Sequence, residues 1–186
     1  PLFDAVKKYI DDNVLPFHVP GHKHGRGIQE LTEYIGQKAL AMDVNGMEEL
    51  DYANNPTGVI LQAQKLMADA FGAEHAYFLV NGTTSGVQTM ILSACEPGSR
   101  IIIPRNAHRS TIGGIILSGA IPVYVQPEIN PQLGIAMGVS VESIKAAIKK
   151  YPHAKAVFVI NPTYYGMAPD LKSIVRVAHR HDMAVL

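Results

Sequence analysis

Residues 100–104 read RIIIP, with three successive isoleucines. A strand with one face in water alternates apolar and polar residues, whereas a continuously apolar strand is covered on both faces, as in a parallel sheet. Three further short runs share this character: HAYFLV at 75–80, IPVYV at 121–125 and KAVFVI at 155–160. We therefore predict a mostly parallel sheet with helices on both faces, which is an α/β fold.

Segments of helical periodicity alternate with these runs. They lie at 84–95, 108–118, 141–150 and 170–181, and two more precede the first run at 2–12 and 54–71. The predicted caps are Asn55, Ser140 and Asp170, with Pro56 at the first helical position of its helix and Gly72 as its terminator.

Two stretches indicate how the chain is organised. VLPFHVPGHKHGRG, at 14–27, is too rich in Pro and Gly for a long regular element. DMAVL, at 182–186, begins another buried strand, so we expect the chain to be a fragment that continues past Leu186. We predict that residues 1–53 form a helix and a Pro/Gly-rich arm, and that residues 54–186 form the first part of a larger domain.

The charged residues balance, with 16 basic and 16 acidic side chains. This excludes the strong positive field of a protein that binds nucleic acid or an anionic membrane, so we expect small-molecule partners. Cys95 is the single cysteine, cannot form an internal disulfide, and is interpreted as a buried small hydrophobic residue. No apolar run approaches the roughly 18 residues of a membrane span, and we expect a cytoplasmic protein.

A polar loop, NGTTSG at 81–86, follows the first predicted strand and opens a helix. Ligands of open α/β sheets bind at the carboxyl ends of strands, and the free N–H groups of a helix start favour an anion. Thr83, Thr84 and Ser85 add hydroxyl donors, so we interpret the loop as a cup that anchors a phosphate. The alternative is a Ser/Thr-rich helix cap without a ligand.

Two more polar loops follow strands. His108 begins a helix after the second strand, and NPTYYG at 161–166 includes Thr163. The flat imidazole could stack on a flat cofactor, although a lone histidine is more often structural. Because all three loops lie at strand carboxyl ends, we expect them to converge on one crevice.

The histidines at 18, 22 and 24 raise the possibility of a metal site. No cysteine or carboxylate lies nearby in sequence, and Lys23 and Arg26 add positive charge that repels a cation. We therefore predict no metal.

The chain resembles the Orn/Lys/Arg decarboxylases in four motifs and in their order, which are FHVPGHK, AFGAEHAYFLVNGTTSG, IIIPRNAHRS and VFVINPTYYG. These are pyridoxal 5'-phosphate (PLP) enzymes of the aspartate-aminotransferase fold, called fold type I. The resemblance implies that Thr83, Thr84 and Ser85 hold the PLP phosphate, that His108 stacks on the pyridine ring, and that Thr163 lies close to the ring. His108 is also a candidate proton donor, and so the predicted catalytic residue of this chain.

The branch that the chain resembles most is the bacterial arginine decarboxylases of polyamine synthesis. This implies decarboxylation of arginine to agmatine, with lysine and ornithine as other candidate substrates, in a homodimer or larger assembly. It also implies that the Schiff-base lysine and the aspartate that pairs with the pyridinium lie beyond Leu186, and that Lys23 is not that lysine. Two alternatives remain: another fold-type-I PLP enzyme, either an aminotransferase or a lyase, and a non-catalytic protein of the same fold.

Overall fold

The computed structural model describes residues 1–186, which divide into two compact units, Pro1–Phe78 and Leu79–Leu186. The N-terminal unit is helical and the C-terminal unit contains the sheet. None of the helices has both the length and the apolar character needed to cross a membrane.

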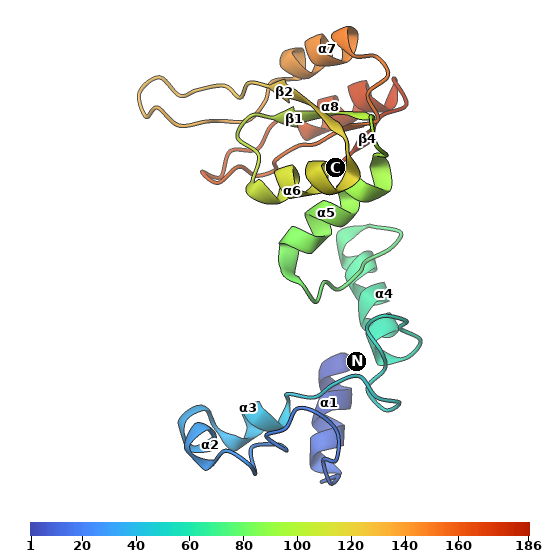
Figure 1. Cartoon of the computed structure of the whole chain (residues 1–186), viewed down its shortest axis with the longest axis vertical. Coiled ribbons are helices and arrows are strands. Elements are labelled where there is room, and N and C mark those ends of the chain that lie inside the picture. The colour runs from blue at the N-terminus through green and yellow to red at the C-terminus, as the bar shows by residue number, and fades with distance from the viewer. The chain divides into compact units, whose positions relative to one another are not determined.

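The N-terminal unit contains four helices, coloured blue to teal in Figure 1: α1 (Leu2–Asp11), α2 (Gln29–Ile35), α3 (Gln37–Ala41) and α4 (Val59–Phe71). Helix α1 confirms the segment predicted at 2–12. Residues 14–27 contain bends and turns and no helix or strand, also as predicted. The short helices α2 and α3 were not predicted.

Helix α4 begins later than its sequence indicated. Its N-cap is Gly58, so the prediction of Asn55 as cap and Pro56 as first helical residue is wrong. The carboxylate of Asp51 instead accepts hydrogen bonds from the N–H groups at the helix start, including that of Gly58 at 2.7 Å. At the other end Gly72 terminates the helix with φ of +63°, a left-handed conformation that glycine adopts without strain, as predicted.

Residues 75–80 were predicted to be a strand, and this prediction is wrong. The segment has no regular structure and is largely exposed, with 75% of Tyr77 and 85% of Val80 accessible. Apolar residues favour a strand only where a neighbouring strand pairs with the backbone. The strands of this chain pair in the order β2-β1-β3-β4, and residues 75–80 pair with none of them.

The C-terminal unit contains four parallel strands: β1 (Arg100–Pro104), β2 (Ile121–Val125), β3 (Ala156–Val157) and β4 (Ala184–Val185). Strands β1 and β2 confirm the predictions in full. Strand β3 is shorter than the run 155–160, although the N–H of Phe158 still donates to the carbonyl of Ile102 at 2.8 Å. Strand β4 confirms that a strand begins within 182–186.

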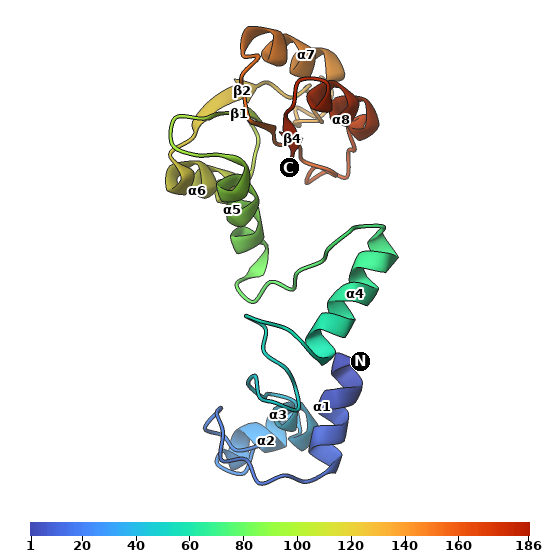
Figure 2. The same ribbon diagram turned by 90° about the vertical axis from the view of Figure 1, so that its right-hand side faces the viewer.

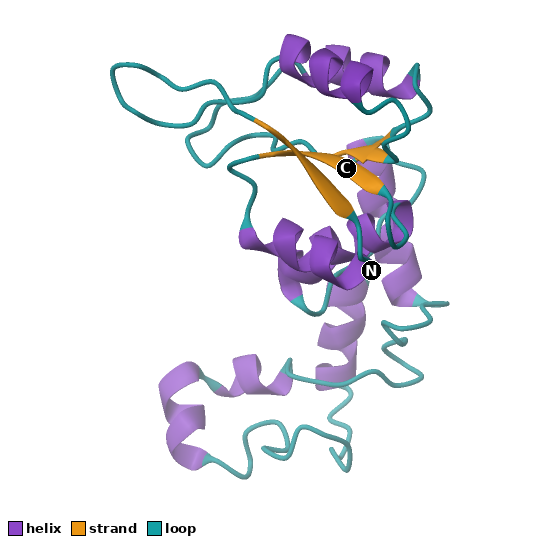
Figure 3. Cartoon of the chain, turned by 45° about the horizontal axis from the view of Figure 1, so that its top comes forward, coloured by secondary structure: helices purple, strands orange, loops and turns teal.

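Both faces of this sheet are covered by helices, α5 (Gly82–Ala94) and α6 (Arg109–Ser118) on one side and α7 (Val141–Lys150) and α8 (Leu171–His179) on the other (Figures 2 and 3). Because side chains alternate along a strand, Ile101 and Ile103 pack with α5 and α6, whereas Ile102 packs with α7 and α8. All three isoleucines are fully buried. The sequence of β1 is therefore continuously apolar because both faces of the strand are buried, as predicted. The α/β fold is confirmed.

The helices of this unit start close to their predicted positions. Ser140 and Asp170 cap α7 and α8 as predicted, since their side chains accept hydrogen bonds from the backbone of Ser143 and Ser173. Helix α5 begins two residues earlier than predicted, and α8 ends two residues earlier.

An antiparallel excursion that was not predicted connects β2 to α7 (Figure 1). We call residues 126–139 the hairpin. The N–H of Met137 donates to the carbonyl of Glu128 at 2.7 Å, and the N–H of Asn130 donates to Ile135 at 2.9 Å. The side chain of Asn130 closes the tip by accepting from the N–H groups of Gln132 and Leu133.

Candidate functional site

A hollow of about 710 Å³ lies among the loops of the C-terminal unit. The start of α5, the start of α6, the hairpin and the loop after β3 all contribute to its wall. It brings together Thr83, His108 and Thr163, one residue from each of the three loops identified in the sequence. The loops therefore converge as expected, whereas the roles of these residues in binding or catalysis stay predictions.

The first turn of α5 presents hydrogen-bond donors without a side-chain cap. Its N-cap residue Asn81 makes no capping hydrogen bond, in contrast to the caps of α6, α7 and α8. Gly82 has a φ of +70°, so glycine suits this turn. Thr83 lines the hollow, while Thr84 does not and is exposed. Ser85 is half-buried, lies off the wall, and donates its hydroxyl hydrogen to the carbonyl of Gly82 at 2.7 Å.

His108 is the N-cap residue of α6. Its Nδ1 atom accepts a hydrogen bond from the backbone N–H of Ser110 at 3.1 Å and lies 2.9 Å from the Ser110 hydroxyl. Because a backbone N–H can only donate, Nδ1 must be the acceptor, and the neutral ring carries its hydrogen on Nε2. The ring is thus held at the helix start with Nε2 free.

Thr163 is buried in the loop after β3, with 6% of its surface accessible. Its N–H donates to the carbonyl of Met167 at 2.8 Å, and its Oγ1 accepts from the N–H of Met167 at 3.2 Å. This pair of hydrogen bonds fixes the loop at the wall of the hollow. The adjacent side chain of Tyr164 lines the same hollow and is almost fully exposed.

Two wall residues, Ser110 and Thr111, were missed in the sequence. Thr111 is fully buried and its Oγ1 has no hydrogen-bond partner, which is unusual for a hydroxyl group away from water. Both could have been found, because residues two and three positions after a helix-capping histidine lie in the same first turn. The hairpin contributes Ile135, and its turn signal was Asn130 followed by Pro131 and then Gly134.

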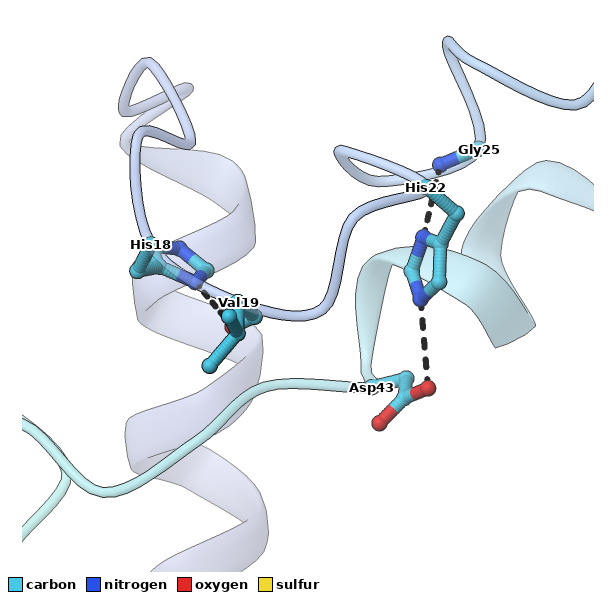
Figure 4. Close-up of polar contacts among 5 residues, drawn as sticks. All are labelled: His18, Val19, His22, Gly25 and Asp43. Carbon is cyan, nitrogen blue, oxygen red and sulfur yellow. Dashed lines mark hydrogen bonds and ion pairs between the residues drawn. The ribbon is translucent and has the colours of Figure 1, made fainter.

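The N-terminal histidines bond within the chain (Figure 4). His22 Nε2 lies 3.1 Å from the carboxylate of Asp43, and His22 Nδ1 accepts from the N–H of Gly25. His18 Nδ1 faces the carbonyl of Val19. Its Nε2 lies 2.7 Å from the hydroxyl of Tyr9. No group of three or more His, Cys, Asp or Glu residues is placed to hold a metal ion.

His24 differs from its two neighbours. It is 9% exposed, and its Nε2 atom is buried without a hydrogen-bond partner. Burial lowers the pKa of His24, and the nearby His18, Arg26 and His22 lower it further. Lys23 lies in this same loop and donates a hydrogen bond to the carbonyl of His18.

Comparison with solved structures shows which proteins share this arrangement of strands and helices. The lysine decarboxylase A of Pseudomonas aeruginosa matches 95% of this chain with a TM-score of 0.79 and 29% identity, over 26% of its own length. NtdA of Bacillus subtilis, solved with bound cofactor PMP, matches 69% of this chain with a TM-score of 0.53 and 25% identity, over 28% of its own length.

Sequence comparison then gives the family. The major domain of the Orn/Lys/Arg decarboxylases matches residues 1–186, and the chain belongs to this family. An arginine decarboxylase of Bacillus subtilis is 48% identical across 100% of this chain. The chain spans 38% of the length of that relative.

Proposed function

We propose that the full-length protein is a PLP-dependent decarboxylase that converts arginine to agmatine and CO₂. The observation that supports this most is the family match across the whole chain, combined with a hollow beside the loops that follow β1 and β3. Arginine is favoured over lysine because identity to the arginine decarboxylase is 48%, against 29% for the lysine decarboxylase of known structure.

The residues around the hollow fit PLP. A phosphate group needs clustered N–H and O–H donors, and the uncapped first turn of α5 with the hydroxyl of Thr83 offers them. A flat heterocycle needs a flat partner, and the imidazole of His108 is held in one orientation beside the hollow. Thr111 also lines the hollow, but its Oγ1 is buried beneath the surface without a hydrogen-bond partner.

In this proposal Thr83, Thr84 and Ser85 hold the phosphate, with Thr84 and Ser85 contributing backbone N–H groups. His108 contacts the ring, and the Thr163 loop lies beside it. Bound PLP supplies a ring that accepts the electron pair released when the substrate α-carboxylate leaves as CO₂. The side chains of Val87, Phe158 and Ile160 give the hollow an apolar part of its wall.

The remaining parts of the proposal extend beyond the hollow. No lysine lines the hollow, and we propose that the Schiff-base lysine and the aspartate that pairs with the pyridinium come from residues past Leu186. Residues 54–186 would then be the first part of the PLP-binding domain. We further propose a homodimer or larger assembly that acts in polyamine synthesis in the cytoplasm, where the free, buried Cys95 suits a reducing compartment.

The substrate test uses the full-length protein loaded with PLP and supplied separately with arginine, lysine and ornithine. We expect CO₂ release to be fastest with arginine, and agmatine to be the amine formed. Faster CO₂ release from lysine or ornithine would mean that this amino acid, and not arginine, is the substrate. Absence of CO₂ from all three would reject a decarboxylase.

A further inference from the structure

The hydroxyl of Ser110 has no task in capping α6. Capping requires only that Nδ1 of His108 accept the N–H of Ser110, at 3.1 Å. The Ser110 hydroxyl nevertheless lies 2.9 Å from the same nitrogen, and Ser110 is 95% removed from solvent, since 5% of its surface is accessible.

The direction of this second hydrogen bond follows from the first. Since Nδ1 already accepts from a backbone N–H, it carries no hydrogen, and the Ser110 hydroxyl must donate to it. Two donors from one residue therefore hold the ring from the same edge. They fix both the plane of the imidazole and the tautomer, with the hydrogen on Nε2.

Because Nδ1 is held, the opposite edge of the ring, which carries Nε2, is the edge left for a ligand. His108 and Ser110 both line the hollow, and Nε2–H makes no hydrogen bond within the chain. A ring that is free to rotate about its side-chain bonds would present either nitrogen to a ligand, as donor or as acceptor. A ring held at Nδ1 can present only an N–H donor.

We propose that Ser110 is a positioning residue, which holds His108 so that its ring face meets the cofactor and its in-plane Nε2–H donates to an oxygen of the bound substrate. This inference rests on the proposed function, because it concerns the same hollow. Ser110 acts through His108 and itself touches neither the reacting atoms nor the phosphate.

Helix α7 provides a matched control. Its cap Ser140 accepts from the N–H of Ser143 at 3.2 Å, and the Ser143 hydroxyl lies 2.6 Å from the same atom. This repeats the two contacts between Ser110 and His108, but Ser143 does not line the hollow. Ser143→Ala therefore removes an equivalent hydroxyl from a helix cap without touching the site.

The experiment measures the dissociation constant of PLP for the full-length protein and the melting temperature without PLP. We expect Ser110→Ala to weaken PLP binding about tenfold, the effect of one lost part-buried hydrogen bond, with a melting temperature close to that of wild type. Ser143→Ala should leave PLP binding unchanged. Ser110→Thr and Ser110→Cys, which keep a donor, should recover part or all of the affinity.

Each result is decisive. Equal PLP binding by wild type and Ser110→Ala would overturn the role of Ser110 and leave the proposed function standing. A large loss of melting temperature in Ser110→Ala, with no recovery of affinity in the threonine and cysteine variants, would show a structural role and overturn the inference. Failure of the wild-type protein to take up PLP would reject the proposed function and this inference together.

Discussion

The carboxylate of Asp51 accepts a hydrogen bond from the N–H of Gly58 at 2.7 Å, although the two residues are seven positions apart. The same side chain accepts from Thr57 at 2.9 Å and from Ile60 at 3.1 Å. Asp51 is 5% exposed. The start of α4 is thus capped by a buried residue that lies outside the helix and its first turn.

Replacing Asp51 by asparagine should lower the melting temperature by several degrees. An amide offers one acceptor oxygen in place of two, and its NH₂ group would face N–H donors that it cannot satisfy. Asp69→Asn, an exposed change on the same helix, is the control and should have little effect. Equal melting temperatures for both variants would show that Asp51 does not stabilise α4.

The same contacts predict an acid-dependent loss of stability. Burial raises the pKa of Asp51, but the N–H groups of Thr57, Tyr52, Gly58 and Leu61 outweigh this and lower it to about 2, from 3.8. A depressed carboxyl pKa stabilises the fold above pH 3.8, and this contribution is lost as the pH falls toward 2. Denaturation curves of wild type should therefore depend more on pH in this window than those of Asp51→Asn.

His24 should make the protein less stable at mildly acidic pH. Because its folded-state pKa lies below 6.5, the unfolded chain binds more protons than the folded one, and stability falls as the pH drops through and below 6.5. The groups near the ring are Tyr9, His18, His22 and Arg26. None of them is a carboxylate that could offset the positive charge of a protonated His24.

His24→Phe keeps a flat ring but cannot take up a proton, so its stability between pH 7.5 and 5 should fall less than that of wild type. His153→Gln, at an exposed position, is the comparison and should follow wild type. Chemical denaturation at several pH values measures both. Parallel profiles for wild type and His24→Phe would contradict this account.

The sequence pattern predicted the sheet and its helices because burial on both faces leaves a direct trace. Ile101 and Ile103 face one helical layer and Ile102 the other, so all three positions must be apolar. The caps Ser140 and Asp170 were also predictable, since each bonds to a residue three positions later. Interactions this local are encoded within a few residues.

Interactions over longer distances were not predictable in the same way. Asn55 and Pro56 form an ordinary helix-start signal, yet the cap comes from Asp51, whose buried position depends on the folded loop. Residues 75–80 have the composition of a strand, but composition does not specify a partner. The sequence predicted the three loops that meet at the hollow. It did not predict the hairpin, and so it did not predict that Ile135 forms part of the wall.

The two threonines at the start of α5 should differ in their effect on PLP binding. Thr83 lines the hollow and Thr84 does not. Thr83→Val, which keeps the shape and removes the hydroxyl, should weaken PLP binding of the full-length protein about tenfold. Thr84→Val should change it by less than about threefold. Equal losses in both variants would contradict this placement.

Pyridoxal without its phosphate provides a second comparison for this pair. If the Thr83 hydroxyl contacts the phosphate, Thr83→Val and wild type should bind pyridoxal equally. A similar loss with pyridoxal and with PLP would place the hydroxyl against the ring instead.

The hairpin should affect the site through its tip. Asn130 Oδ1 accepts from the N–H groups of Gln132 and Leu133 at 3.0 and 2.9 Å, and this holds the turn that leads to Ile135 at the wall. Asn130→Ala should raise the KM for the amino acid a few-fold with little change in melting temperature. Asn130→Asp keeps the acceptor oxygen and should have the KM of wild type. A KM unchanged in Asn130→Ala would show that the tip does not shape the hollow.

The central claim is that the start of α5 and the ring of His108 hold one PLP molecule between them. A crystal structure of the full-length protein grown with PLP tests this most directly. We expect the phosphate within hydrogen-bonding distance of the first-turn N–H groups of α5 and the Thr83 hydroxyl, with the pyridine ring against the imidazole of His108. PLP bound elsewhere, or a phosphate in contact with neither Thr83 nor the α5 N–H groups, would contradict the account.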